Sequence, residues 1–176
     1  IELASTVSEI GDQAFQKCTN LKDVVLNKGL RKIGKGTFYE CLSLKSIELS
    51  STVSEVGDAA FKKCSNLKDV VLNEGLQKIG EGTFYKCSSL ERIEFSSTVS
   101  EIGVRAFQKC SNLKDVVLNE GLRKIGNGAF CLCISLESIK FSSTISEISG
   151  AAFVKCRLLK DVVLNEAPKN RDRRIL

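Results

Sequence analysis

The sequence predicts an α/β solenoid, a stack of similar coils in which each coil buries its apolar edge against its neighbours. Three residue types carry this prediction, because each recurs every 23 residues through the 176-residue chain without an insertion or deletion. A length of 176 residues and a hydrophobic fraction of 43% suit a chain with a substantial core. The recurring residues are Phe15, Phe38, Phe61, Phe84, Phe107, Phe130 and Phe153; Cys18, Cys41, Cys64, Cys87, Cys110, Cys133 and Cys156; and Leu21, Leu44, Leu67, Leu90, Leu113, Leu136 and Leu159.

The segment after each cysteine predicts a short strand. Its pattern L-x-x-V-x-L places Val24 and Leu26 two residues apart, so both side chains lie on one face of the strand. A polar turn of the type NKG or SST follows, and then a second short apolar segment that ends at Ile33. When identical coils stack, we expect these strands to pair in parallel about 4.8 Å apart.

The segment around each phenylalanine predicts one or two turns of helix. Counting from Ala14, apolar residues stand at i, i+1, i+4 and i+7, which lie on about one helical face. Asp12 and Asp58 occupy the position of a helix N-cap. Each coil is therefore expected to carry strands of a parallel sheet on one side and short helical turns on the other.

Alternate units are more alike than adjacent ones, so the true sequence period is 46 residues. Units such as VSEIGDQAFQKCTNLKDVVLN alternate with units such as LRKIGKGTFYECLSLKSIELSST. Recent duplication of a two-unit pair is the simpler explanation. The alternative is a ligand with a matching two-coil spacing of about 10 Å.

The pattern L-x-x-[VI]-x-[LF]-x-x-x-[LV]-x-x-I-G-x-x-[AT]-F-x-x-C resembles the BspA-like, or treponemal-type, class of leucine-rich repeats. The I-G…[AT]-F…C half separates this class from the common leucine-rich repeat with its asparagine ladder. The resemblance implies a curved solenoid of right-handed stacked coils, with the L-x-x-V-x-L strands on the concave face. It also implies a binding or adhesion role, because such repeats occur in surface proteins of bacteria and protists, and it implies no catalysis.

We predict two regions, a solenoid of about seven repeats over residues 1–166 and a basic, irregular tail over residues 167–176. The repeat pattern stops after Asn165, and Pro168 would interrupt a further coil. The tail carries four basic residues and one acidic residue. Residues 1–166 carry twenty-two basic and twenty acidic residues, so most of the net charge of +5 belongs to the tail.

Seven of the eight cysteines share one column beside the phenylalanines, which favours buried free thiols packed as small apolar groups. A disulfide ladder is one alternative, since stacked Cα atoms about 5 Å apart are within range, but parallel Cβ directions oppose it. A zinc site is another, but a linear column does not converge on one point. Cys131, which replaces Tyr39 and Tyr85 in their column, is expected to be partly exposed and the most reactive thiol.

The outward side chains of the strands form the candidate partner-binding face. One interpretation is purely structural, because valine suits strands and alternating charges keep like charges apart. The other is a protein-binding face with apolar spots in a charged field, although it lacks the aromatic residues typical of binding hot spots. The candidate residues are Lys22, Asp23, Val25, Lys45, Glu48, Lys68, Asp69, Val71, Arg92, Glu94, Lys114, Asp115, Val117, Lys140, Asp161 and Val163.

No pattern in the sequence indicates an enzyme or a cofactor. The chain has no histidine, the usual general acid or base, and its repeated G-x-G turns do not extend to a phosphate-binding loop. No apolar run is long enough for a membrane helix. We predict a non-enzymatic protein-interaction or adhesion module with a protein or cell-surface macromolecule as its partner.

Two other functions stay open at the level of sequence. One is a structural spacer within a larger multidomain protein. The other is binding of nucleic acid or an anionic surface through the tail, which the weakly charged body of the chain does not support. Free thiols favour a cytoplasmic protein, whereas the resemblance favours display at the cell surface or secretion.

Overall fold

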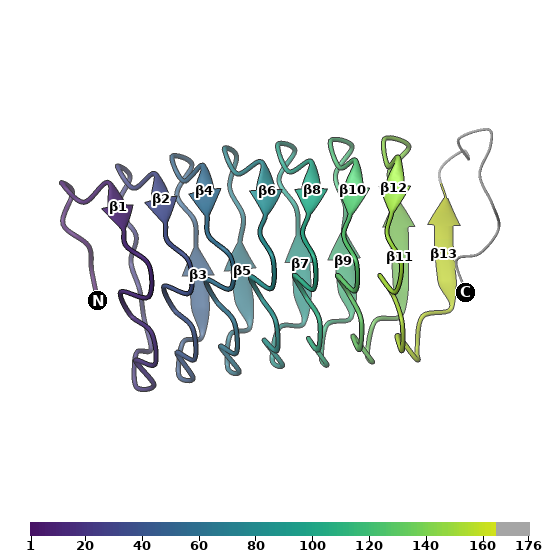
Figure 1. Cartoon of the computed structure of the whole chain (residues 1–176), viewed down its shortest axis with the longest axis horizontal. Helices are drawn as coiled ribbons and strands as arrows, with labels where there is room; N and C mark the ends of the chain where they lie inside the picture. Colours follow the sequence, from purple (N-terminus) through teal and green to yellow (C-terminus); the bar gives the residue numbers. More distant parts are fainter. Residues whose placement is uncertain (165–176) are drawn as a thin grey trace.

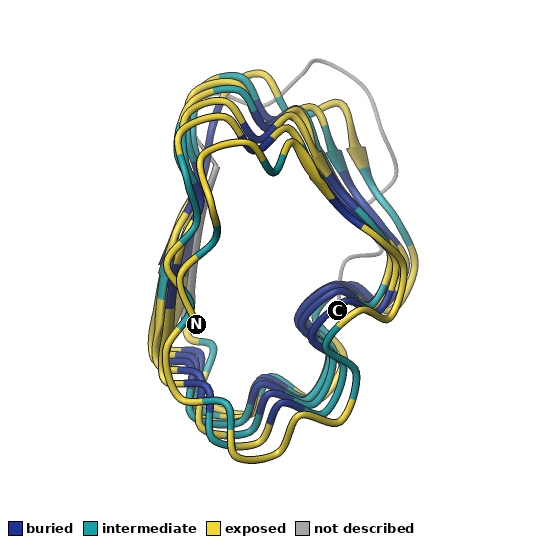
Figure 2. Ribbon diagram, turned by 90° about the vertical axis from the view of Figure 1, so that its left-hand side faces the viewer, coloured by how far each residue is buried: buried dark blue, intermediate teal, exposed yellow. Residues whose placement is uncertain are grey.

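The computed structural model describes residues 1–164, and the side chains of residues 1–160. The chain winds into stacked coils that lie in a nearly straight row (Figure 1). Seen along the row, successive coils superimpose into one closed outline, and buried segments recur at the same places in it (Figure 2). The predicted solenoid is therefore confirmed. We number the coils 1 to 7 by their phenylalanines, from Phe15 to Phe153.

The coils contribute strands to two columns, and every pairing between strands is parallel. The short strands are β1 (Glu9–Ile10), β2 (Lys32–Ile33), β4 (Glu55–Val56), β6 (Lys78–Ile79), β8 (Glu101–Ile102), β10 (Lys124–Ile125) and β12 (Glu147–Ile148). The longer strands are β3 (Ser46–Glu48), β5 (Asp69–Val71), β7 (Arg92–Glu94), β9 (Asp115–Val117), β11 (Ser138–Phe141) and β13 (Asp161–Leu164). Coil 1 has a single bridge, between Glu2 and Val25, in the place of its longer strand.

Both columns are interrupted at the same place, between coils 3 and 4. Among the described strands, β4 does not pair with β6, and β5 does not pair with β7. The segments around the phenylalanines of these coils nevertheless stay bonded. The amide of Phe61 donates to the Thr83 carbonyl at 2.9 Å, and the amide of Lys63 donates to the Tyr85 carbonyl at 2.7 Å.

The prediction of short helical turns is wrong, because none of residues 1–164 lies in a helix. The residues two before and two after each phenylalanine have left-handed backbone, for example φ of 58° at Gln13 and 59° at Lys17. A left-handed residue ends a right-handed helix, so the segment becomes a series of tight turns. Alternate amides then face the next coil, and the amide of Phe15 donates to the Thr37 carbonyl at 2.9 Å.

The predicted N-cap role of Asp12 and Asp58 is wrong for the same reason. The Asp12 Oδ1 atom accepts a hydrogen bond from the backbone amide of Lys35 at 2.7 Å, and Asp58 accepts one from the Glu81 amide at 2.8 Å. Each carboxylate therefore satisfies a backbone donor of the following coil instead of one in its own segment.

The core is organised around a continuous stack of phenylalanine rings on the side of the coils that carries these tight turns, which we call the turn side. Rings of adjacent coils lie 5.2 to 5.4 Å apart between centroids, with planes inclined by no more than 16°. Offset parallel stacking of this kind is favourable for aromatic pairs. The rings of coils 2 to 6 are almost completely buried.

The cysteine column runs beside the rings, and its thiols bond to them through the backbone. The Cys41 thiol donates to the Phe15 carbonyl of the preceding coil at 3.1 Å, and the same contact recurs for each column cysteine up to Cys156. All eight cysteines are free. Burial raises the pKa of Cys41 and Cys156 to about 11, and that of Cys110 well above its ordinary value.

The buried-thiol interpretation is therefore confirmed for the five cysteines of coils 2 to 6. It is wrong for Cys18, which is exposed in the structure. Cys156 is half-buried, and so is Cys131, as predicted for the latter. Exposure makes Cys18 a second accessible thiol beside Cys131.

The 46-residue period has a structural counterpart in the loops that follow the longer strands. In one loop type, the Asn27 side chain donates to the Ala4 and Val7 carbonyls of the preceding loop at 2.8 and 2.9 Å. In the other type, the Thr52 hydroxyl lies 2.9 and 2.7 Å from the Lys28 and Leu30 carbonyl oxygens and donates its one proton between them. Each loop thus bonds to a preceding loop of the opposite type.

Close contact with the preceding loop requires glycine in two of the Asn-x-Gly loops, at Gly75 and Gly121. A Cβ atom on Gly121 would lie 2.4 Å from the Ser97 carbonyl oxygen of the preceding loop, which is much closer than atoms can approach. The alternation of loop types therefore has a reason in the packing of the coils, and no ligand is needed to explain it.

Candidate functional site: the long-strand face

The outward side chains of the longer strands form the surface that we call the long-strand face. Alternation along each strand positions them: in β7, Ile93 is buried while Arg92 and Glu94 are exposed. Every predicted partner-binding residue from Lys22 to Lys140 is exposed in the structure. The side chains of Asp161 and Val163 lie outside the described residues.

Exposed valines are the main apolar feature of this face. Val25, Val71 and Val117 are 55%, 46% and 38% exposed. They belong to coils 1, 3 and 5, and the even-numbered coils present a charged residue at the same position, such as Glu48. The apolar spots are therefore two coils apart, with charge between them.

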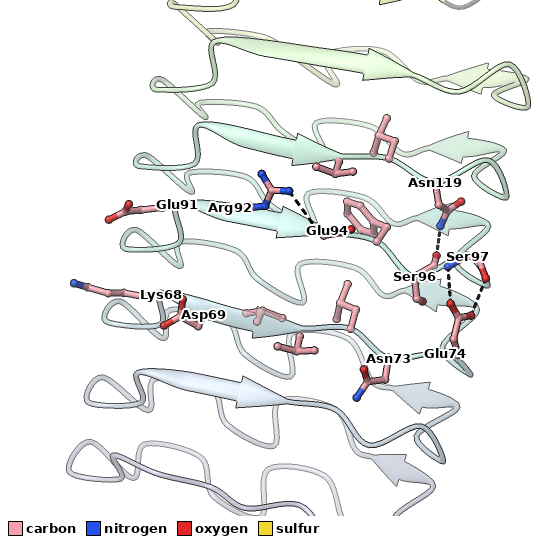
Figure 3. A pocket seen from close by; sticks show the side chains of 16 residues that line it. Lys68, Asp69, Asn73, Glu74, Glu91, Arg92, Glu94, Ser96, Ser97 and Asn119 are labelled. Carbon is pink, nitrogen blue, oxygen red and sulfur yellow. Dashed lines mark hydrogen bonds and ion pairs between the residues drawn. The ribbon is translucent and has the colours of Figure 1, made fainter.

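A shallow groove of about 850 Å³ crosses β5, β7 and β9 on this face (Figure 3). Its lining includes Val71, Val117 and the edge of the buried Phe95. Charged side chains stand at one end, where Figure 3 shows Lys68 and Glu91 pointing away from the strands. Two of the exposed valines, Val71 and Val117, therefore line the same groove.

The groove lies where β5 and β7 are not paired with each other. Val70 on β5 is only half-buried, whereas Ile47 and Ile93 in the same column are buried. The facing edges of β5 and β7 are therefore not joined by a strand ladder, although the two strands still lie side by side.

The polar groups in the groove are held loosely at its centre and firmly at the end opposite Lys68 and Glu91 (Figure 3). At the centre, Arg92 and Glu94 form an exposed ion pair at 3.5 Å, which contributes little to stability. At the end, Glu74 accepts hydrogen bonds from the Ser97 hydroxyl at 2.8 Å and the Ser97 amide at 3.2 Å, and Asn119 donates to the Ser96 carbonyl. This end is pre-organised, whereas the centre can rearrange.

Sequence reasoning missed Asn73, Glu74, Ser97 and Asn119, because they follow the strands and were read only as polar turns. A signal for them was present. The tripeptide Asn-Glu-Gly occurs at residues 73–75 and again at 119–121, one double period apart.

The described part of the chain contains no group of three or more histidine, cysteine, aspartate or glutamate side chains placed to hold a metal ion. Within residues 1–164 there is also no helix with the length and apolar character that crossing a bilayer requires.

The sequence matches the family described as BspA type leucine-rich repeat region, in six copies over residues 1–114 and 77–172. The chain belongs to this family. The resemblance that the I-G…F…C pattern indicated is therefore confirmed, and the solenoid is that of a BspA-type leucine-rich repeat. No curated protein matches the sequence.

Solved structures of bacterial leucine-rich repeat proteins share this fold. A protein from Eubacterium ventriosum is 24% identical with a TM-score of 0.84, over 99% of this chain and 45% of its own. The T. pallidum leucine-rich repeat protein is 28% identical with a TM-score of 0.74, over 94% of this chain and 70% of its own. A leucine-rich cell surface protein from Faecalibacterium prausnitzii is 19% identical with a TM-score of 0.54, over 94% and 59%. The chain spans less than half of the E. ventriosum protein.

Proposed function

We propose that this BspA-type leucine-rich repeat solenoid is a non-enzymatic module that binds a protein through the long-strand face. The observation that carries the proposal is the groove over β5, β7 and β9, where two exposed valines flank strand edges that are not paired with each other. Apolar spots within a charged surface are what a partner protein can recognise.

The composition of the face sets the expected strength of binding. Aromatic anchors, which dominate tight interfaces, are missing from its exposed side chains, and Phe95 is buried. Valines that recur every second coil allow a partner to make several similar weak contacts at once. Avidity across coils is therefore the expected source of affinity.

Substitution of the valines tests the proposal. Val71→Asp and Val117→Asp place charge at the apolar spots, and Val154→Asp, at an equally exposed valine on the turn side, is the matched control. We expect the two long-strand variants, and not the control, to lose a partner captured from the source cells, with unchanged circular dichroism. An unchanged set of captured proteins would exclude this face and favour the spacer alternative.

We propose a cytoplasmic location on the basis of the eight free thiols. The alternative is the cell surface, where the F. prausnitzii protein of similar fold is found, as its description states. Protein purified without reductant and denatured should show eight reactive thiols per chain. A lower count would indicate oxidation and favour the surface.

A further inference from the structure

The small net charge of residues 1–166 conceals a separation of charge between the sides of the solenoid. We define a turn segment as the eight residues from two before each phenylalanine to five after it. These segments carry eight basic residues and one acidic residue, Glu40, whereas the rest of residues 1–166 carries fourteen basic and nineteen acidic residues. The basic residues are Lys17, Lys62, Lys63, Lys86, Arg105, Lys109, Lys155 and Arg157.

Three of these lysines line a groove of about 540 Å³ on the turn side. Lys63, Lys86 and Lys109, which we call the lysine row, occupy the same position in coils 3, 4 and 5. A serine of the same coil lines the groove beside each lysine, and the apolar side chains of Leu42, Leu132 and Ile134 complete the lining. The serines are Ser65, Ser88 and Ser111. The row therefore runs along the stack of coils.

Among the described residues, two of the three lysines in the row lack the carboxylate partner that the short strands give to their lysines. On the short strands, each of Lys32, Lys78 and Lys124 pairs with a glutamate of the next coil at 3.0 to 3.4 Å. In the row, Lys63 pairs with Glu40 at 2.6 Å, whereas no described carboxylate lies within ion-pair distance of Lys86 or Lys109. Neighbouring like charges repel, so an external anion would relieve the row.

The spacing of the row indicates a linear ligand. The row shares the stacking interval of the rings, which is 5.4 Å from Phe61 to Phe84 and 5.2 Å from Phe84 to Phe107. An extended polymer with an anionic group every few ångströms could contact successive ammonium groups, and the serine hydroxyls could donate hydrogen bonds to the same groups or to sugar hydroxyls.

The neighbouring tyrosines argue against nucleic acid as that polymer. The Lys62 ammonium lies over both Tyr39 and Tyr85, 5.7 and 5.1 Å from the ring centroids. Rings covered in this way do not offer the open faces on which bases stack. We propose that the lysine row binds a linear sulfated polysaccharide that lies along the turn side, independently of the protein-binding face.

The test is binding of the full chain to heparin, as a sulfated probe, at several salt concentrations. One variant carries Lys63→Gln, Lys86→Gln and Lys109→Gln. Two controls remove the same charge elsewhere: Lys45→Gln, Lys68→Gln and Lys114→Gln on the long-strand face, and Arg171→Gln, Arg173→Gln and Arg174→Gln in the tail. We expect the row variant to bind at least about tenfold more weakly in 0.15 M salt and with a flatter salt dependence, and each control to change affinity less than about twofold.

Each other outcome contradicts the proposal. Equal losses in the three variants would mean that net charge alone attracts heparin, and a loss confined to the tail variant would move the site to residues 167–176. Equal binding of uncharged dextran would show that the row does not require an anion. No binding of heparin would contradict the proposal directly. Tighter binding of single-stranded DNA of equal charge would assign the row to nucleic acid. Circular dichroism of every variant checks that the solenoid stays folded.

Discussion

The turn side and the strand columns hold the coils together to different degrees. On the turn side, stacked rings and thiol–carbonyl hydrogen bonds join every described coil to the next. Both strand columns, in contrast, are interrupted between coils 3 and 4. We therefore expect the turn side to contribute most of the cohesion between coils, above all between coils 3 and 4.

The difference matches the roles that we propose for the two sides. The interruption produces the groove on the long-strand face, whereas the continuous turn side keeps the lysine row in line. Four predictions test how far this comparison holds, in order of decreasing effect.

Phe84→Ala should have the largest effect, because its ring stacks on both Phe61 and Phe107. We expect the free energy of unfolding to fall by about 3–5 kcal/mol in chemical denaturation. The matched control is Phe95→Ala in the same coil, where the ring makes one edge contact with Phe107, at 5.7 Å, and borders the groove. A control as destabilising as Phe84→Ala would contradict the claim that the turn side dominates.

Gly103→Ala should be the next most destabilising change. Its added Cβ would lie 2.7 Å from the Ile79 carbonyl oxygen, so the backbones of coils 4 and 5 must move apart, at a cost of about 1–3 kcal/mol. At the interruption, a Cβ on Gly80 would meet only the Asp58 carboxylate that closely, and the Val56 carbonyl at 3.3 Å. We therefore expect Gly80→Ala to lower the free energy of unfolding by less than Gly103→Ala, as measured by thermal unfolding. Equal decreases would show that coils 3 and 4 are packed as tightly as the others.

Alkaline pH should weaken the turn side through its thiols. Burial raises the pKa of Cys41 to about 11 and that of Cys87 and Cys110 well above the ordinary value. Above pH of about 8.5 the unfolded chain loses thiol protons that the folded chain keeps, so the free energy of unfolding falls by about 1.4 kcal/mol per pH unit for each such thiol. The effect is absent below that pH and continues until the folded thiols ionise.

Denaturation between pH 8 and 10 measures this slope, and a Cys87→Ala, Cys110→Ala double variant should show a shallower one. The matching control is a Val99→Ala variant, which truncates a buried side chain that carries no titratable proton and should leave the slope unchanged. An identical slope in all three proteins would show that the thiols do not govern alkaline stability.

The smallest effect should come from the ion pairs of the short strands. Lys124 and Glu147 lie 3.4 Å apart with side chains 43% and 52% exposed. Lys124→Gln should therefore change the free energy of unfolding by less than about 1 kcal/mol, and by still less in 1 M salt. A larger loss that persists in salt would mean that the short-strand column contributes more than the comparison allows.

The fold was predictable where the same residue type recurs at the same buried position of successive coils. Phe61, Cys64 and Leu67 keep their interval because stacked coils need the same residue at the same place, and their burial follows from that. The helical turns were wrong because apolar residues at i, i+1, i+4 and i+7 also share a face in a series of tight turns. The backbone handedness is set by hydrogen bonds to the next coil, and in the sequence only Gly36, Gly82 and Gly128, at left-handed positions, indicated it.

The exposure of the candidate site was predictable from alternation along Arg92, Ile93 and Glu94. Its groove was not, because the residues on either side of the interruption resemble those at the other coil junctions, and the width between β5 and β7 depends on how whole coils stack. The lysine row was not predicted for a related reason. The net charge of the chain is small, and the separation of basic from acidic residues follows from which side of the solenoid each residue occupies.

The alternation of loop types and of short-strand charges has a consequence for how such arrays change length. Removal of one 23-residue unit would set Lys32 against Lys78 and an Asn-x-Gly loop against another of its kind. Removal of 46 residues would leave every neighbour with a complementary one. Unequal crossing-over is therefore expected to leave viable descendants that differ by pairs of coils, so that the reach of the rod changes in steps of about 10 Å.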